Sequence, residues 1–289
     1  MMRALKVFSF AILALAAVIF SVSAAVGFMN RDETIPEIAA ESGELEITCA
    51  YTEEELLAGV TASDGKDGDL TDQILVGDFS RFITPGVCDL TYVVFDSSGN
   101  MADLTRRVTF TDYHSPRFAL SQPLCFEAGT TNNTDVRAMF TASDMLDGDL
   151  TDWITYVETD AYYSTPGDYT ITMEVRNSFG DTVSYAFPIH ILEENTVDAE
   201  ILLTEPVVYL SVGDSFDPAD YLESAADADG YSYTADQLTI TSGVDTSAAG
   251  LYEVRYQLEA ADEEGNLTSY GETWLTVIVE EVPALADRN

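Results

Sequence analysis

Two clusters of aspartates are the residues of this sequence best suited to binding chemistry. Residues 60–72 read VTASDGKDGDLTD, and residues 140–152 read FTASDMLDGDLTD. A hard cation such as Ca²⁺ takes six to eight oxygen ligands, and an Asp-Gly-Asp turn holds carboxylates close together. The spacing differs from that of an EF-hand, which needs a late bidentate glutamate. The candidate calcium ligands are Asp64, Asp67, Asp69, Asp72, Asp144, Asp147, Asp149 and Asp152.

The same aspartates have a second interpretation that needs no metal. Aspartate is a common turn former because its carboxylate accepts hydrogen bonds from nearby backbone N–H groups. The sequence leaves both interpretations open, and turn formation is the more common role.

Tyrosines are the second group of candidates. Aromatic rings that reach the surface can stack on sugars or anchor a protein partner. Rings at these positions can also fill a core or coat the face of a strand. The candidate ligand contacts are Tyr162, Tyr163, Tyr231 and Tyr233. We expect Trp153, which directly follows the second acidic segment, to plug one end of its domain instead.

Few residues of this sequence are suited to catalysis. Its two histidines, His114 and His190, have no cysteine near them in sequence and suggest no Ser/His/Asp order. Neither a glycine loop for phosphate nor a cysteine and histidine spacing for zinc is present. We therefore expect no enzymatic activity.

Charge and cysteine content narrow the partners and the compartment. Against 51 acidic residues stand 12 basic ones, giving a formal net charge of −39. This charge repels phosphate backbones and excludes nucleic acid as a partner, whereas it suits a cation, a cationic partner or solubility alone. The 3 cysteines are Cys49, Cys88 and Cys125. Cys49 and Cys88 could form a disulfide between two sheets or remain two buried thiols.

The N-terminal segment predicts export. An uncharged run of 22 residues, Val7 to Phe28, follows Arg3 and Lys6. Such a run can cross about 30 Å of hydrocarbon as a helix, and the basic residues before it place the N-terminus in the cytoplasm. Its length favours an uncleaved signal anchor within residues 1–29, giving a single-pass membrane protein. The small residues Val22-Ser23-Ala24 leave open a cleaved signal peptide and a secreted protein.

A repeat of 80 residues organises the remainder of the chain. Each acidic segment is followed by a Pro-Gly turn, then by residues that alternate between apolar and polar, then by a turn rich in Asp, Asn and Gly. A diverged third copy has Ala225–Gly230 at the position of the acidic loop. Because alternation with period two indicates strands with one buried face, each unit predicts a β-sandwich.

We expect a stalk over 30–43, domains over 44–112, 113–193 and 197–281, and a tail over 282–289. One helical turn is expected in each domain, within 52–57, 134–139 and 216–222. The short links predict that the domains stack end to end, with the second acidic loop near the linker residue Asp112.

The pattern TASD-x-x-DGDLTD, the Pro-Gly turn and the aromatic alternating strand resemble the tandem immunoglobulin-like (Ig-like) domains of bacterial surface proteins, including those appended to some pesticidal crystal toxins. The resemblance covers residues 44 to 280 and is weakest in the third repeat. It implies three tandem Ig-like β-sandwiches. Together with the transmembrane helix that the uncharged run predicts, the expected fold is an all-β chain of three sandwiches after one N-terminal transmembrane helix. The resemblance also implies a role in adhesion, binding or spacing at the cell surface. A scaffold for envelope assembly and a glycan-binding module are the alternatives, and the partner is the membrane together with an unknown protein or glycan.

Overall fold

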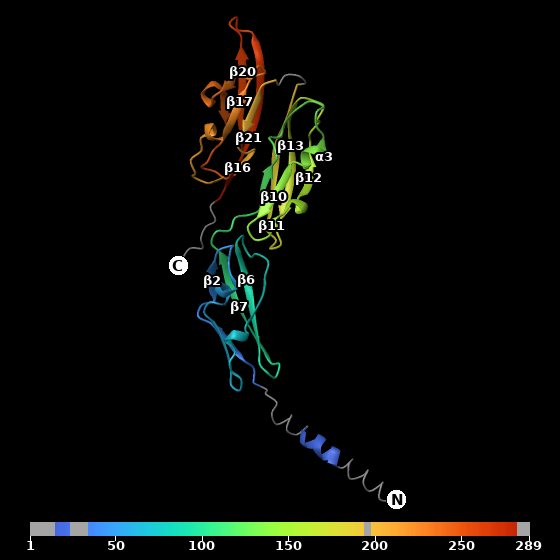
Figure 1. The fold of residues 1–289 in the computed structure, drawn as a ribbon, viewed down its shortest axis with the longest axis vertical. Helices are drawn as coiled ribbons and strands as arrows, with labels where there is room; N and C mark the ends of the chain where they lie inside the picture. The colour runs from blue at the N-terminus through green and yellow to red at the C-terminus, as the bar shows by residue number, and fades with distance from the viewer. Residues whose placement is uncertain (1–14, 24–33, 194–197, 282–289) are drawn as a thin grey trace, which may run out of the picture. The chain divides into compact units, whose positions relative to one another are not determined.

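The computed structural model describes residues 15–23, 34–193 and 198–281, and it shows an all-β protein with a few short helices (Figure 1). The chain divides into two compact units. The first holds most of the first sandwich, and the second holds residues 48–50, 81–86 and the chain from Phe110 onward.

The predicted membrane segment lies largely outside the described residues. Residues 15–23 are helical. Over the described residues, no helix has the length and apolar character that crossing a membrane requires.

Sandwich 1 consists of two β-sheets. The sheets have the orders β1-β3-β4 and β2-β7-β6-β5. Their strands are β1 (Glu37–Ala40), β2 (Glu44–Ile47), β3 (Val60–Asp64), β4 (Gly68–Asp69), β5 (Leu75–Phe79), β6 (Val87–Phe95) and β7 (Met101–Phe110). The predicted stalk over 30–43 is therefore wrong from Glu37 on, because Glu37–Ala40 pair with Val60–Ser63 as the first strand.

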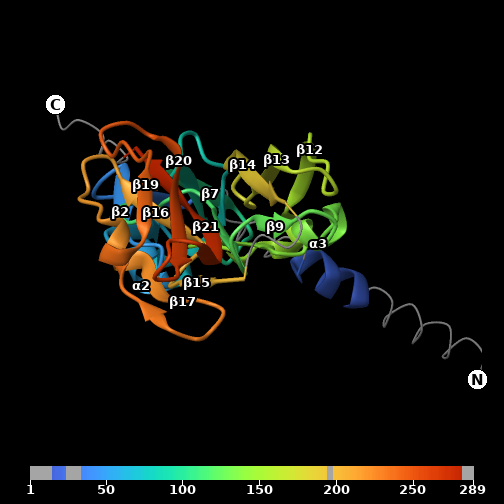
Figure 2. The same ribbon diagram turned by 90° about the horizontal axis from the view of Figure 1, so that it is seen from above.

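Sandwich 2 repeats this arrangement. Its sheets have the orders β11-β10-β8 and β12-β13-β14-β9, and Figure 2 shows β12, β13 and β14 in this sequence. The strands are β8 (Arg117–Leu120), β9 (Cys125–Glu127), β10 (Phe140–Asp144), β11 (Gly148–Asp149), β12 (Thr155–Thr159), β13 (Gly167–Arg176) and β14 (Thr182–Leu192).

Sandwich 3 has the same two sheets in diverged form. Their orders are β15-β17-β18 and β16-β21-β20-β19. The strands are β15 (Glu200–Leu203), β16 (Val207–Ser211), β17 (Leu222–Ala226), β18 (Ser232–Tyr233), β19 (Thr239–Ser242), β20 (Gly250–Ala261) and β21 (Leu267–Glu280). Of the predicted loop Ala225–Gly230, the first two residues end β17, and the others lie in the turn that joins β17 to β18, at the position that the acidic loops occupy in the other sandwiches.

The predicted helical turns are confirmed. Helix α2 (Glu53–Leu57) begins at a capping box formed by Thr52 and Glu55. Helix α3 (Asn133–Arg137) begins at Asn132, whose side chain accepts from the N–H groups of Thr134 and Asp135. The third turn is a 3₁₀ helix, η3 (Pro218–Tyr221). Two further 3₁₀ turns, η1 (Thr71–Gln73) and η2 (Thr151–Trp153), follow the acidic loops, and η4 (Ala235–Gln237) follows β18.

Within the second unit, sandwiches 2 and 3 pack side by side, so the expected end-to-end stacking is wrong for this pair. The outer face of β21 turns toward sandwich 2, where Ile278 is fully buried in the core cluster of that sandwich. At one end of the contact, Arg117 binds Glu280 at 2.6 Å. At the other end, the thiol of Cys125 lies 3.7 Å from the carbonyl oxygen of Glu272. Strand β21 is therefore buried on both faces over much of its length. We call this contact the seam.

All three cysteines are free thiols, so Cys49 and Cys88 form no disulfide. Burial raises the pKa of the Cys88 thiol to about 11, which keeps it protonated and unreactive at neutral pH.

Candidate functional site

The first acidic loop uses its aspartates to build the turn itself. Asp64 Oδ1 accepts from the backbone N–H groups of Lys66 and Asp67 at 2.7 and 3.0 Å. Asp67 accepts from the N–H and hydroxyl of Ser97 at 2.7 and 2.9 Å. Asp69 accepts from the N–H of Thr71 at 3.0 Å. The bond from the N–H of Asp67 is the main reason that the pKa of Asp64 lies below its usual value.

The second acidic loop repeats these bonds. Asp144 Oδ1 accepts from Leu146 and Asp147, Asp147 accepts from Ser178, and Asp149 accepts from Thr151. Gly148 has a φ of 74°, a left-handed conformation that glycine adopts without strain. The remaining candidates, Asp72 and Asp152, are exposed in the 3₁₀ turns η1 and η2.

Among the described residues, no group of three or more His, Cys, Asp or Glu side chains is placed to hold a metal ion. The bonds account for Asp64, Asp67, Asp69 and their counterparts as turn formers. Calcium binding therefore stays a prediction.

The second loop lies beside the linker, as its position in the repeat predicts. The buried hydroxyl of Tyr113, next to Asp112, donates to Asp181 Oδ2 at 2.8 Å and accepts from Asn177 Nδ2 at 2.9 Å. Asp144 Oδ2 lies 3.4 Å from the same hydroxyl. Burial and the neighbouring Asp181 raise the pKa of Tyr113, so the hydroxyl stays protonated and remains a donor. The linker is thus an integral part of sandwich 2.

Two of the four tyrosine candidates are exposed and the other two are half-buried. The side chains of Tyr162 and Tyr231 are 70% and 64% exposed. Tyr163 packs against the core of sandwich 2, and the hydroxyl of Tyr233 donates to Asp227 Oδ2 at 2.9 Å. Tyr231 and Tyr233 meet edge to face with ring centroids 5.2 Å apart. The expectation for Trp153 is wrong, because its side chain is 59% exposed and does not plug the sandwich.

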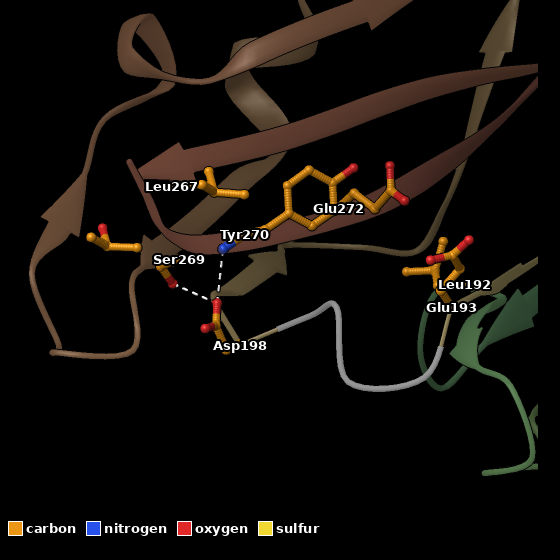
Figure 3. Close-up of a pocket in the computed structure, with 8 residues that line it drawn as sticks. Leu192, Glu193, Asp198, Leu267, Ser269, Tyr270 and Glu272 are labelled. Carbon is orange, nitrogen blue, oxygen red and sulfur yellow. Dashed lines mark hydrogen bonds between the residues drawn. The ribbon is translucent and has the colours of Figure 1, made fainter. Parts of the chain in front are cut away.

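A groove with a volume of about 530 Å³ lies at one end of the seam (Figure 3). Leu192, the last residue of β14 in sandwich 2, and Glu193 after it form one side, and the first half of β21 forms the other. The lining residues of the groove are Leu192, Glu193, Asp198, Leu267, Thr268, Ser269, Tyr270 and Glu272.

The groove combines carboxylates with apolar and aromatic surface. Asp198 Oδ1 accepts from the hydroxyl of Ser269 at 2.7 Å and from the N–H of Tyr270 at 2.8 Å, as Figure 3 shows. These two bonds lower the pKa of Asp198 and keep it ionised. Glu272 is paired with Arg255, which also donates to the hydroxyl of Tyr270.

Because none of the lining residues is basic, the charge of the groove favours a cationic group, and Leu267 and Tyr270 add surface for an apolar stem. A smaller pocket of about 200 Å³ shares Leu192 and Glu272 with the groove and extends it along the seam. Sequence reasoning missed this site, because it depends on residues from two sandwiches.

Comparison with known proteins agrees with the fold. Residues 201–273, most of sandwich 3, match the family model described as "Bacterial surface protein, Ig-like domain". Residues 201–273 therefore belong to an Ig-like domain of the bacterial surface type. The chain is also 31% identical over 203 residues to the pesticidal crystal protein Cry22Aa of Bacillus thuringiensis, covering 68% of the chain and 27% of that protein. This similarity confirms the family resemblance that the repeats predicted.

Two further similarities are more limited. An uncharacterized 81.3 kDa protein of Acholeplasma phage L2 is 30% identical over 144 residues, covering 48% of this chain and 18% of that protein. Both relatives are thus several times longer than the matched Ig-like region. The solved M60 catalytic domain with two CBM51 domains from Clostridium perfringens ZmpB is 13% identical, covers 88% of this chain and 32% of that one, and has a TM-score of 0.23. That score is too low to support a functional comparison.

Proposed function

We propose that this protein is a non-catalytic surface protein whose Ig-like domains serve adhesion, binding or spacing outside the cell. The match to bacterial surface Ig-like domains supports an extracellular position. The uncharged run from Val7 to Phe28 supports a membrane tether at the N-terminus.

The groove is the observation that carries the binding part of this proposal. Two sandwiches that pack side by side hold the carboxylates of Glu193 and Asp198 at one hollow, with Tyr270 and Leu267 beside them. A lysine or arginine side chain of a partner protein fits such a surface, since its stem is apolar and its head is cationic. The net charge of −39 favours the approach of such a partner.

Two measurements test the proposal. Protease added to intact cells that express the full chain should digest the sandwiches, and digestion only after lysis would refute the surface position. A fluorescent peptide of alternating lysine and leucine should bind the full chain in detergent, and its acidic counterpart of glutamate and leucine should not.

Substitutions at the groove test whether the peptide binds there. Asp198→Asn and Glu193→Gln should each weaken the lysine peptide by about two- to fivefold, as expected for charges at the rim of a contact. Glu158→Gln, at an exposed residue of β12 that does not line the groove, is the matched control and should not change the affinity. Equal effects of all three variants would mean that the peptide senses only net charge.

Glycan binding is the second candidate, and the exposed rings of Trp153, Tyr162 and Tyr231 favour it. Aromatic faces at the surface can stack on sugar rings. Binding to a glycan array that disappears in Tyr231→Ala or Tyr162→Ala would support this function over the peptide groove.

A further inference from the structure

The seam contains a histidine that contacts both sandwiches. His190 of β14 lies in sandwich 2, and its side chain is 8% exposed. Its Nδ1 lies 2.8 Å from Asp168 Oδ1 of β13, and its Nε2 lies 2.8 Å from Glu253 Oε1 of β20. Its ring stacks on Trp274 of β21, with centroids 3.9 Å apart and an angle of 8° between the planes.

Both ring nitrogens face carboxylates, and this determines which protonation state of the ring forms two favourable hydrogen bonds. A carboxylate accepts hydrogen bonds, so both contacts are favourable only when both nitrogens carry a proton. The imidazolium donates to Asp168 in its own sandwich and to Glu253 in the other. The neutral ring has one N–H and must turn a lone pair toward one of the two carboxylates.

We propose that His190 is a pH-sensitive latch: the imidazolium holds sandwich 3 against sandwich 2, and loss of its proton weakens the seam.

The other groups around His190 agree with this assignment. Arg255 of β20 lies 5.5 Å from the centroid of the Trp274 ring, but its charge is paired with Glu272. Cys125 of β9 is the cross-strand neighbour of His190, and burial raises the pKa of its thiol to about 12, so it stays neutral. Asp168 and Glu253 therefore remain the charges that act on the ring.

Burial of His190 opposes its protonation, but the hydrogen bonds and charges of Glu253 and Asp168 outweigh burial and raise its pKa. A raised pKa in the closed state means that the latch is fully formed below the usual histidine pKa of about 6.5. It is lost as the pH rises through the higher pKa of the closed state. Apolar contacts such as that of Ile278 remain, so deprotonation increases how often the sandwiches separate rather than unfolding them.

The groove depends on the latch because its lining comes from both sandwiches. A ligand that binds there should be held more weakly at alkaline pH. The latch can be tested without identifying that ligand, so its test is independent of the proposed function.

His190 and the two tryptophans of the chain allow the latch to be tested. Trp153→Phe leaves Trp274 as the single tryptophan of the full chain in detergent. Its quenching by acrylamide should increase as the pH rises, because opening of the seam exposes the ring. Losing one charge-assisted hydrogen bond should raise the open population by about tenfold or more. Histidine NMR should show His190 titrating above the usual histidine pKa of about 6.5 and at the same midpoint as the quenching.

Glu253→Gln should lower both midpoints together, since the amide keeps a polar contact but removes the charge. Glu259→Gln, on the same strand, is the matched control and should leave both unchanged. Circular dichroism at each pH reports whether the strands remain folded. The proposal is overturned if His190 titrates at or below the usual histidine pKa of about 6.5, or if it titrates while the quenching of Trp274 stays constant.

Discussion

Shortening Ile278 to alanine should separate the folding of sandwich 3 from that of sandwich 2. Ile278 belongs to β21 of sandwich 3, yet its side chain is fully buried in the core cluster of sandwich 2 together with Val207. Its neighbour Val277 is also fully buried but belongs to the core cluster of sandwich 3. Two adjacent residues of one strand therefore stabilise two different cores.

The size of the effect follows from burial. Replacing a fully buried isoleucine by alanine costs about 2–5 kcal/mol, from the lost transfer free energy and the cavity that remains. In Ile278→Ala this loss falls on the seam and on sandwich 2. The core of sandwich 3 stays intact because Val277 and Leu275 are unchanged.

Calorimetry of the full chain in detergent, combined with acrylamide quenching of Trp274 in the Trp153→Phe background, measures the effect. We expect sandwiches 2 and 3 to unfold together in the parent protein and in two separate transitions in Ile278→Ala. Quenching of Trp274 should increase below the first transition. Val277→Ala is the matched control, and it should lower the melting temperature without exposing Trp274 in the folded protein.

The reasoning would be refuted by equal quenching of Trp274 in the two variants. It would also be refuted by an Ile278→Ala protein that melts as the parent does, because a fully buried side chain at a true seam must affect stability when it is removed.

Two further predictions concern the acidic loops and the linker. If the loops bind calcium, a hundredfold excess of Ca²⁺ over its dissociation constant should stabilise the protein by about 2.7 kcal/mol relative to chelator. The double variant Asp147→Ala, Asp149→Ala should abolish this stabilisation. Identical melting curves with Ca²⁺ and with chelator would leave these aspartates as turn formers alone. Tyr113→Phe should lower the unfolding free energy of the second unit by about 1–3 kcal/mol in urea denaturation, because Asp181 loses its buried donor. An unchanged midpoint would show that the linker does not stabilise sandwich 2.

The repeated features were predictable because they depend on local sequence. Strands such as β6 and β13 alternate apolar and polar residues, and alternation alone predicts a strand with one buried face. Helix α2 follows from the pair Thr52 and Glu55, whose side chains cap the helix without help from distant residues. In the acidic loops, Asp64 and Asp69 and their counterparts Asp144 and Asp149 bond to N–H groups two or three residues away, so the repeated sequence also repeats these bonds.

Features that depend on distant contacts were predicted wrongly. Strand β1 carries the sequence EIAA, which is too short to show alternation of apolar and polar residues, and it is a strand because β3 pairs with it. Trp153 is exposed although its position after the acidic loop suggested a plug. The run from Trp274 to Val279 lacks strict alternation of apolar and polar residues, and this could have indicated the burial of both faces of the strand. Such a run predicts a strand buried on both faces, but not the identity of the second partner.

The charge of the chain explains why the seam needs particular residues. Two domains of a protein with 51 acidic and 12 basic residues should repel each other on average. At the seam, cations of sandwich 2 meet carboxylates of sandwich 3: Arg117 binds Glu280, and His190 binds Glu253. Arg117 also lies over the ring of Tyr209, whose hydroxyl accepts from the N–H of Phe118. Few cations are available, so those at the seam decide where the domains join. Composition alone gives their number but not their position, and the seam could therefore be found only from the structure.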